Sequence, residues 1–239
     1  MAKAVALNNE RHRNLRVITK RGAEYGENTN LVPVIADELR NLVLEYPVCI
    51  TKNPNNGQFS LCALLGFEPD ENLFLYGDEW KAEYLPLHIR RQPFMVGHKK
   101  TSAEGDTEAL IIIDTDSERV QEKEGERLFN DDGSKSSYLE EVTVILSQLI
   151  SGMTSTSAFL KYLAEEDLIE PVQLSVRFSN GEQKRYEGLY TVNDEKLQKL
   201  DAARLVSMHQ RGYLQAAYWL SASMGQVRKL IALKNDLIK

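Results

Sequence analysis

Cysteine is scarce in this sequence. Cys49 and Cys62 are the only two among 239 residues, and they do not form a C-x-x-C pair. Each lies in an apolar run typical of a β-strand, so we expect reduced and buried thiols. A disulfide between the two runs is an alternative only if the protein lies in an oxidising compartment.

Motifs of the common enzyme classes are also lacking. The chain contains no P-loop, no G-x-G-x-x-G and no G-x-S-x-G. The histidines are far apart in the sequence and lack the paired spacing of a zinc site; they occupy positions 12, 88, 98 and 209. The sequence therefore gives no support to a structural zinc site, and we predict no cofactor.

Positive charge does not dominate either. The chain has 29 Lys and Arg against 35 Asp and Glu, a formal net charge of -6. Non-specific attraction to nucleic acid is therefore not expected. The N-terminal residues lack the apolar segment and cleavage site of a secretory signal, and no stretch approaches the ~20 apolar residues of a membrane span. We expect a cytoplasmic protein that binds no nucleic acid and does not span a membrane.

Hairpin and helix patterns are what the sequence does contain. PVCITK and FSLCALL flank the turn NPNNG, and VQLSVRF and KRYEGLYTV flank Asn180-Gly181, so both pairs predict β-hairpins. Apolar residues recur at helical spacing in residues 35–43 and again after Tyr138. We predict an α+β fold: a mixed, largely antiparallel sheet with β-hairpins, helices packed on it, and a long C-terminal amphipathic helix after Gly212.

Residues 1–14 are polar and are predicted to be a flexible arm, followed by a single α+β domain over residues 15–239. ALIIID, residues 109–114, is expected to be a fully buried strand. The charged, Gly-containing residues 117–136 are expected to be an exposed loop or a frayed helix. We also expect two helices after Tyr138, joined at SGMTSTSAF with Ser157 as an N-cap.

The segment YLPLHIRRQPFMVG, residues 84–97, places His88, Arg90 and Arg91 between prolines and apolar residues. Adjacent residues of a short helix point in different directions, so only one arginine can face the interior. We expect that one to pair with a carboxylate or backbone carbonyls, because a buried guanidinium without partners is costly. The other is a candidate, with His88, for binding an anionic ligand or an acidic partner; plain solvent exposure is the alternative.

Asp114 and Asp116 end the ALIIID strand one residue apart. Alternation along a strand would place both carboxylates on one face, where they could hold a divalent cation or supply a nucleophile. Solvated carboxylates at a strand end are the alternative, and the spacing alone does not decide between them.

Two longer stretches resemble the SapC family of bacterial proteins. The first is YPVCITKNPNNGQFSLCALLGFEPDENLFL with YLPLHIRRQPFMVG, and the second runs from FLKYLAEEDLIEPVQLSVRF to HQRGYLQAAYWLSASMGQVRKLI. The resemblance spans about residues 15–235 and implies a shared fold but no established catalytic residues. It also implies a gene context: a surface-layer gene cluster gave the family its name, and members are often encoded near tryptophan-halogenase-like flavoproteins, cupin-like proteins and TonB-dependent receptors. One departure is visible, since Glu166-Asp167 stands where a glycine is expected in the turn before LIEP.

The leading functional hypothesis is a cytoplasmic, non-catalytic binding or accessory protein whose partner is a protein or a small anionic ligand. The resemblance to the SapC family suggests halogenase-like flavoproteins or outer-membrane uptake systems as possible protein partners. An enzyme of unrecognised type is the first alternative, with Asp114 and Asp116 on a divalent metal or the arginines as an anion clamp. A surface-layer-associated structural protein is the second. The sequence does not indicate an oligomeric state.

Overall fold

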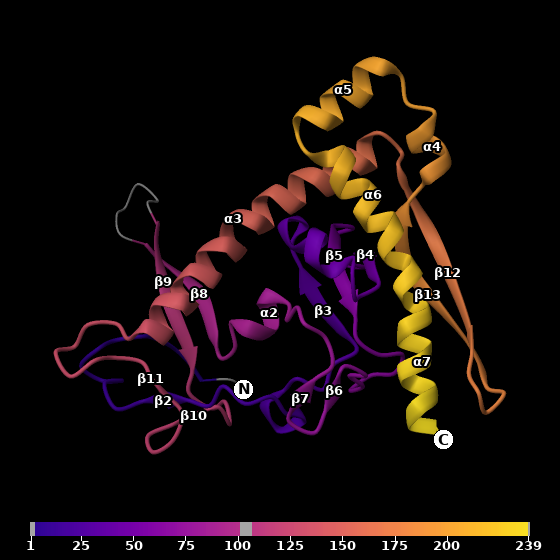
Figure 1. Ribbon diagram of the computed structural model, residues 1–239. Coiled ribbons are helices and arrows are strands. Elements are labelled where there is room, and N and C mark those ends of the chain that lie inside the picture. Colours follow the sequence, from indigo (N-terminus) through magenta and orange to yellow (C-terminus); the bar gives the residue numbers. More distant parts are fainter. Residues whose placement is uncertain (1–2, 101–106, 239) are drawn as a thin grey trace. The chain divides into compact units, whose positions relative to one another are not determined.

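The computed structural model describes residues 3–100 and 107–238 (Figure 1). The predicted α+β class is confirmed, because the strands pair antiparallel and helices fill most of the second half. The sequence predicts a single domain, and the chain divides into two compact units that we describe in turn. Unit 1 comprises Met1–Asn28, Leu75–Trp80 and Leu87–Ser151; unit 2 comprises Thr29–Phe74, Lys81–Pro86 and Gly152–Lys239.

Two three-stranded antiparallel sheets organise unit 1, in the orders β1-β9-β8 and β10-β2-β11. Strand β1 lies in the predicted flexible arm, yet it pairs with β9 from Ala4 opposite Asp114 to Ala6 opposite Ile112. The sequence HKKTSAEGDTE, residues 98–108, predicts a polar connection, and its residues 101–106 fall outside the described residues. The strands are β1 (Ala4–Ala6), β2 (Arg16–Val17), β8 (Phe94–Lys100), β9 (Thr107–Asp114), β10 (Val120–Gln121) and β11 (Glu126–Arg127).

The prediction of an exposed loop or frayed helix over residues 117–136 holds for most of that segment, which is largely exposed and non-helical, but not for two short strands. The segment supplies β10 and β11, which pair with the two sides of β2. Gly125 permits the turn between them: its φ is +96°, and a Cβ there would lie 2.5 Å from the carbonyl oxygen of Val17. The charge pattern could not reveal β2 as a partner, because β2 lies about a hundred positions away in the sequence.

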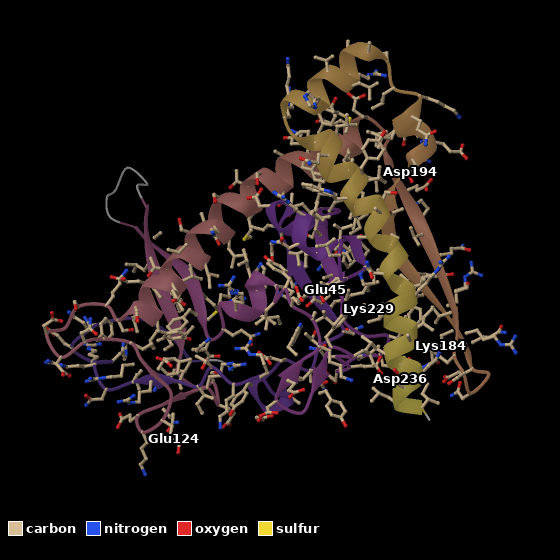
Figure 2. The ribbon with its side chains drawn as sticks, in the orientation of Figure 1. Glu45, Glu124, Lys184, Asp194, Lys229 and Asp236 are labelled. Carbon is tan, nitrogen blue, oxygen red and sulfur yellow. The ribbon has the colours of Figure 1, made fainter. Side chains whose placement is uncertain are left out.

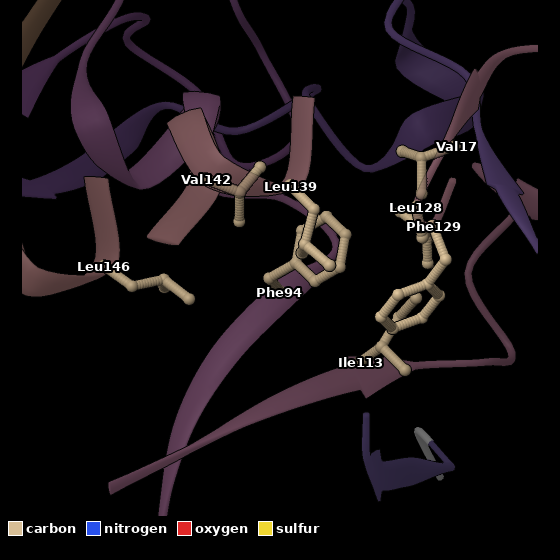
Figure 3. Packing of buried hydrophobic residues seen from close by; sticks show 8 residues of the cluster. All are labelled: Val17, Phe94, Ile113, Leu128, Phe129, Leu139, Val142 and Leu146. Carbon is tan, nitrogen blue, oxygen red and sulfur yellow. The ribbon is translucent and has the colours of Figure 1, made fainter. Parts of the chain in front are cut away.

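The core of unit 1 joins residues of these sheets to the first half of helix α3 (Ser137–Glu165) (Figure 3). Strand β9 contributes Ile113 as its one buried residue between positions 109 and 114. The prediction of a fully buried ALIIID strand is therefore wrong: only one face of β9 meets the core, as is common in antiparallel sheets. The buried cluster consists of Val17, Phe94, Ile113, Leu128, Phe129, Leu139, Val142 and Leu146.

Short elements complete unit 1. The predicted helix in YLPLHIRRQ is confirmed as α2 (Leu87–Arg90), with Leu87 and Ile89 buried. The others are the 3₁₀ helix η1 (Ala23–Tyr25) and the hairpin of β6 (Leu75–Tyr76) with β7 (Glu79–Trp80).

A five-stranded antiparallel sheet of order β12-β13-β4-β5-β3 forms the centre of unit 2 (Figure 1). Both predicted hairpins are confirmed, β4 with β5 and β12 with β13. Cys49 lies directly opposite Cys62 in the first hairpin, and both are free thiols. The strands are β3 (Leu31–Val34), β4 (Val48–Lys52), β5 (Phe59–Leu64), β12 (Ile169–Arg177) and β13 (Gln183–Val192).

The predicted C-terminal helical stretch is confirmed. Gly212, with φ +74°, separates it from the preceding helix. Ser223 fixes it to the sheet, since its buried hydroxyl accepts from Val48 N at 3.0 Å. Lys229 pairs with Glu45 at 3.3 Å (Figure 2). The helices of unit 2 are η2 (Ala36–Glu38), α1 (Leu39–Leu42), α4 (Asp194–Gln198), α5 (Ala202–Gln210), α6 (Tyr213–Ser223), η3 (Met224–Gln226) and α7 (Val227–Ile238).

Helix α3 is one continuous helix of 29 residues, so the predicted junction at SGMTSTSAF and its N-cap at Ser157 are wrong. Gly152 belongs to the helix because Ile35 packs on it: a Cβ there would lie 2.3 Å from Ile35 Cδ1. Among the described residues, α3 alone has the length and apolar composition to cross a membrane, although the sequence led us to expect no such stretch; 39% of the window is buried in the protein. A core helix of a soluble protein passes the same test, so this is weak evidence for a span.

The turn after α3 explains the departure from the family pattern. Asp167 adopts φ +55°, the left-handed region in which a glycine was expected. Aspartate is among the residues that tolerate this region, and its carboxylate pairs with Lys196. The loop thus keeps the geometry of a glycine turn without a glycine.

Candidate functional site

A cavity of about 380 Å³ in unit 1 brings the two groups of sequence candidates together, since both Arg91 and the Asp114–Asp116 pair line it. It is formed by three segments that are distant in the sequence: residues 24–26, residues 91–93 with 95, and residues 114 and 116–118.

Pairing of β8 with β9 brings the second and third segments together. Phe94 lies opposite Ile113, and Asp114 N donates to Pro93 O at 3.2 Å. Phe94 N also donates to Arg91 O at 2.7 Å, which closes a tight turn around the cis peptide bond between Gln92 and Pro93. The end of β9 is thereby held beside the turn that follows α2.

Arg91 is half-buried, and part of its guanidinium is already engaged. Nε donates to His88 Nδ1 at 3.1 Å, and Nη1 donates to Phe94 O at 2.6 Å. Burial lowers the pKa of Arg91. No carboxylate of the described residues lies within ion-pair distance of Arg91. The expectation that one arginine binds a backbone carbonyl is confirmed at Arg91, and donors remain on its outer end.

His88 positions Arg91 and does not line the cavity. Burial, reinforced by the charge of Arg91, lowers the pKa of His88 to about 4. The imidazole is therefore neutral at neutral pH and can accept the Nε–H of Arg91. Arg90 is exposed and also lies outside the cavity lining. The arginine pair thus splits, and only Arg91 faces the candidate site.

Gln92 contributes a buried polar atom to the same cavity. Its side-chain oxygen Oε1 is buried, and no described residue donates a hydrogen bond to it. A buried acceptor without a donor costs free energy, and each such group in a folded protein calls for an explanation.

Asp114 and Asp116 lie together at the edge of the cavity, where Asp116 N donates to Asp114 Oδ1 at 3.1 Å. Glu24 and Glu118 line it as well, so the lining contains one arginine and four acidic residues. Within residues 3–100 and 107–238, however, no three His, Cys, Asp or Glu side chains are grouped so as to hold a metal ion. The arrangement is acidic without the ligand set of a metal site.

A buried ion cluster, which the sequence analysis missed, supports the remaining wall. Glu27 and Arg119 are 0% and 1% exposed, and Arg119 Nη2 donates to Glu27 Oε1 at 2.6 Å. Arg21 Nη1 donates to the same oxygen at 2.7 Å. The guanidinium of Arg119 lies 4.5 Å from the centre of the Tyr25 ring, so it positions the residue that lines the cavity.

No signal in the sequence indicates this cluster or the burial of the Gln92 oxygen. Charged residues in polar segments ordinarily predict solvated side chains, and Glu27 and Arg119 are 92 positions apart. An amide between an arginine and a proline likewise does not indicate that its oxygen is buried.

A second cavity, of about 430 Å³, lies in unit 2 beside α4. Its polar groups largely satisfy one another: Ser221 Oγ donates to Asp194, which Figure 2 labels, at 2.7 Å, and Asn193 both caps α4 and donates to Glu170. Only Thr191 Oγ1 is buried there without a partner. The cavity of unit 1, with a guanidinium, a buried acceptor and carboxylates free of ion pairs, is the stronger candidate.

The fold and cavity define an α+β protein with an acidic cavity that contains one arginine. The SapC family model matches residues 7–230, so the chain belongs to the SapC family. No curated protein and no solved structure matches the chain.

Proposed function

We propose that this SapC protein is a non-catalytic binding protein and that the unit-1 cavity holds a small charged molecule. The observation that carries this proposal is Arg91: it is half-buried, has no carboxylate partner in the described chain, and lines the same cavity as Asp114 and Asp116. Uncompensated polar groups that converge on one cavity are the usual mark of a ligand site.

The chemistry of the lining favours binding over catalysis. It includes carboxylates, an amide and the hydroxyls of Tyr25 and Ser117, but no histidine, cysteine or lysine. The Ser117 hydroxyl accepts from Arg119 N at 3.3 Å, and the nearby histidine, His88, uses Nδ1 to accept from Arg91, so neither is arranged as a nucleophile with its base. The site is built to hold charge rather than to transfer protons.

An accessory role in the cytoplasm is the setting we propose for this binding activity. The family resemblance suggests halogenase-like flavoproteins or outer-membrane uptake systems as partners. A small-molecule binding protein encoded beside such systems could carry or sense a molecule that they process or import.

Scanning fluorimetry against a panel of small charged metabolites tests the proposal. We expect at least one compound to raise the melting temperature, and Asp114→Asn to weaken that effect. Glu124→Gln is the matched control, because Glu124 is an exposed carboxylate of unit 1 that does not line the cavity (Figure 2).

The bound compound is then incubated with the protein and analysed by mass spectrometry. Recovery of unchanged compound is expected. Conversion into a product that stops on the same substitution would contradict the non-catalytic proposal and favour an enzyme with this cavity as its active site. If no compound shifts the melting temperature, the binding proposal fails.

A further inference from the structure

We infer that the ligand of the unit-1 cavity is a zwitterion of the α-amino acid class, with its carboxylate on Arg91 and its ammonium group beside Asp114 and Asp116. This inference rests on the proposed function, because it names the chemistry of the molecule that the same cavity binds.

The arginine end is suited to a carboxylate. A guanidinium carries five N–H donors. In Arg91, Nε–H donates to His88 and one Nη1–H donates to Phe94 O, at 3.1 and 2.6 Å. The remaining donors lie on Nη1 and Nη2, the end of the guanidinium that can bind both oxygens of a carboxylate in parallel.

The opposite end is suited to an ammonium group, which has three donors and no acceptor. Asp114 uses one oxygen to accept from Asp116 N at 3.1 Å, which leaves its second oxygen and the Asp116 carboxylate as acceptors. An ammonium group could therefore pair with both carboxylates.

Neither a simple anion nor a simple cation fits the whole lining. An anion at Arg91 would meet the repulsion of the carboxylates of Asp114, Asp116, Glu24 and Glu118, and a cation would leave Arg91 without its counter-charge. A zwitterion satisfies both ends. The excess of carboxylates also disfavours an acidic side chain, so the preferred amino acids are neutral or basic.

The cavity also has room and apolar surface for a side chain. Its volume of about 380 Å³ lies within the range of small-molecule sites, roughly 300–1,000 Å³. Pro93, Met95 and the ring of Tyr25 supply apolar contacts. An amino-acid side chain of moderate size could lie against them.

The first experiment measures the melting temperature of the full chain by scanning fluorimetry in the presence of each standard amino acid. The amino acid with the largest shift is then compared, by calorimetric titration, with its decarboxylated amine and its deaminated acid. We expect each analogue to bind at least about tenfold more weakly, since each loses one charge-assisted interaction. This comparison uses unaltered protein, so it does not depend on whether a variant folds.

Two substitutions assign the ends. Arg91→Lys should lower the affinity for the amino acid by about tenfold, because Lys keeps the charge but not the two-donor geometry. The affinity for the amine should stay unchanged. Asp114→Asn should lower the affinity for both the amino acid and the amine, and Glu124→Gln should change neither affinity.

The possible failures are distinguishable. If the amine binds as tightly as the amino acid, the zwitterion inference is overturned while the proposed ligand site stands. The same holds if no amino acid binds but another charged metabolite binds in an Asp114-dependent manner. If nothing charged binds, the inference and the proposed function fail together.

Discussion

Replacing Glu27 by Gln should be among the most damaging single changes in unit 1. Glu27 and Arg119 are 0% and 1% exposed, and the two are 2.6 Å apart. Glu27 also accepts from Arg21 Nη1 at 2.7 Å and from Gly22 N at 3.0 Å. Gln keeps the size of the side chain, so the substitution tests charge and hydrogen bonding rather than packing.

The expected cost follows from what the change leaves behind. Arg119 would stay buried, with the carbonyls of Ile18 and Lys20 and the Tyr25 ring as its neighbours but without a negative charge. Removing one partner of a buried ion pair typically costs about 3–5 kcal/mol. With a urea m-value of roughly 2 kcal/mol/M, the unfolding midpoint should fall by about 2 M.

The chain offers a convenient probe for the measurement. It contains two tryptophans, Trp80 in unit 1 and Trp219 in unit 2. A Trp219→Phe background therefore leaves Trp80 fluorescence as a reporter of unit 1 during urea unfolding. Asp131→Asn is the control, because Asp131 and its partner Arg127 are 87% and 47% exposed, and such pairs contribute about 0–1 kcal/mol.

A companion variant separates charge from shape. Glu27→Leu combined with Arg119→Met should recover much of the loss, since replacing a whole buried ion pair by apolar residues is often neutral. If the free energy of unfolding of the Glu27→Gln variant lies within about 1 kcal/mol of that of Asp131→Asn, the cluster does not stabilise unit 1 and the reasoning is wrong.

Three further predictions concern other residues. The pKa of His88 is depressed from 6.5 to about 4 in the folded protein, so the unfolded chain takes up a proton first as the pH falls. The contribution of neutral His88 to the free energy of unfolding should be present above pH 6.5 and decline toward pH 4 by at most about 3 kcal/mol. In urea unfolding, a His88→Gln variant should lack this dependence of the unfolding free energy on pH. Gly152→Ala should destabilise unit 2 by about 1–2 kcal/mol, because the new Cβ would meet Ile35 at 2.3 Å, whereas Gly225→Ala, with no atom within 4 Å, should be neutral; equal melting temperatures for the two variants would contradict the packing argument. Burial raises the pKa of the Cys62 thiol, so alkylation by iodoacetamide at pH 8 should be at least about tenfold slower in folded protein than in urea, and equal rates would show that the thiol is accessible.

Local signals in the sequence predict the hairpins and the capped helices well. Asn56-Gly57 and Asn180-Gly181 specify tight turns through positive φ at glycine, and Gly57 and Gly181 have φ +70° and +86°. Asn193 caps α4 by accepting from Lys196 N, a role for which asparagine before a helix is a common signal. These features depend on residues that are neighbours in the chain, so periodicity and turn chemistry are sufficient to find them.

Features that depend on distant contacts were predicted badly. The Ser- and Thr-rich middle of α3 looks like a helix break, yet packing of Ile35 on Gly152 outweighs the weak local propensity. Strands β10 and β11 look like loop because their partner, β2, lies far away in the sequence. In each case tertiary contacts decide a conformation on which the local sequence is ambiguous.

The candidate site combines both situations. Arg91, Asp114 and Asp116 were identifiable as residue types, but their meeting in one cavity depends on the register of β8 with β9. The orphan oxygen of Gln92 depends on three-dimensional burial and could not be predicted. Sequence patterns therefore gave half of the site and no indication that its halves belong together.

The fixed state of Arg91 has a consequence for affinity. Its bonds to Phe94 O and His88 already hold the guanidinium in one orientation, and neutral His88 keeps that bond without adding a positive charge at neutral pH. A ligand carboxylate therefore need not order this side chain, which would otherwise cost about 0.5–1.5 kcal/mol on binding. Losing the His88 acceptor should then weaken binding through orientation alone, even though His88 does not line the cavity. This places His88, predicted as a ligand-binding residue, in the role of positioning Arg91.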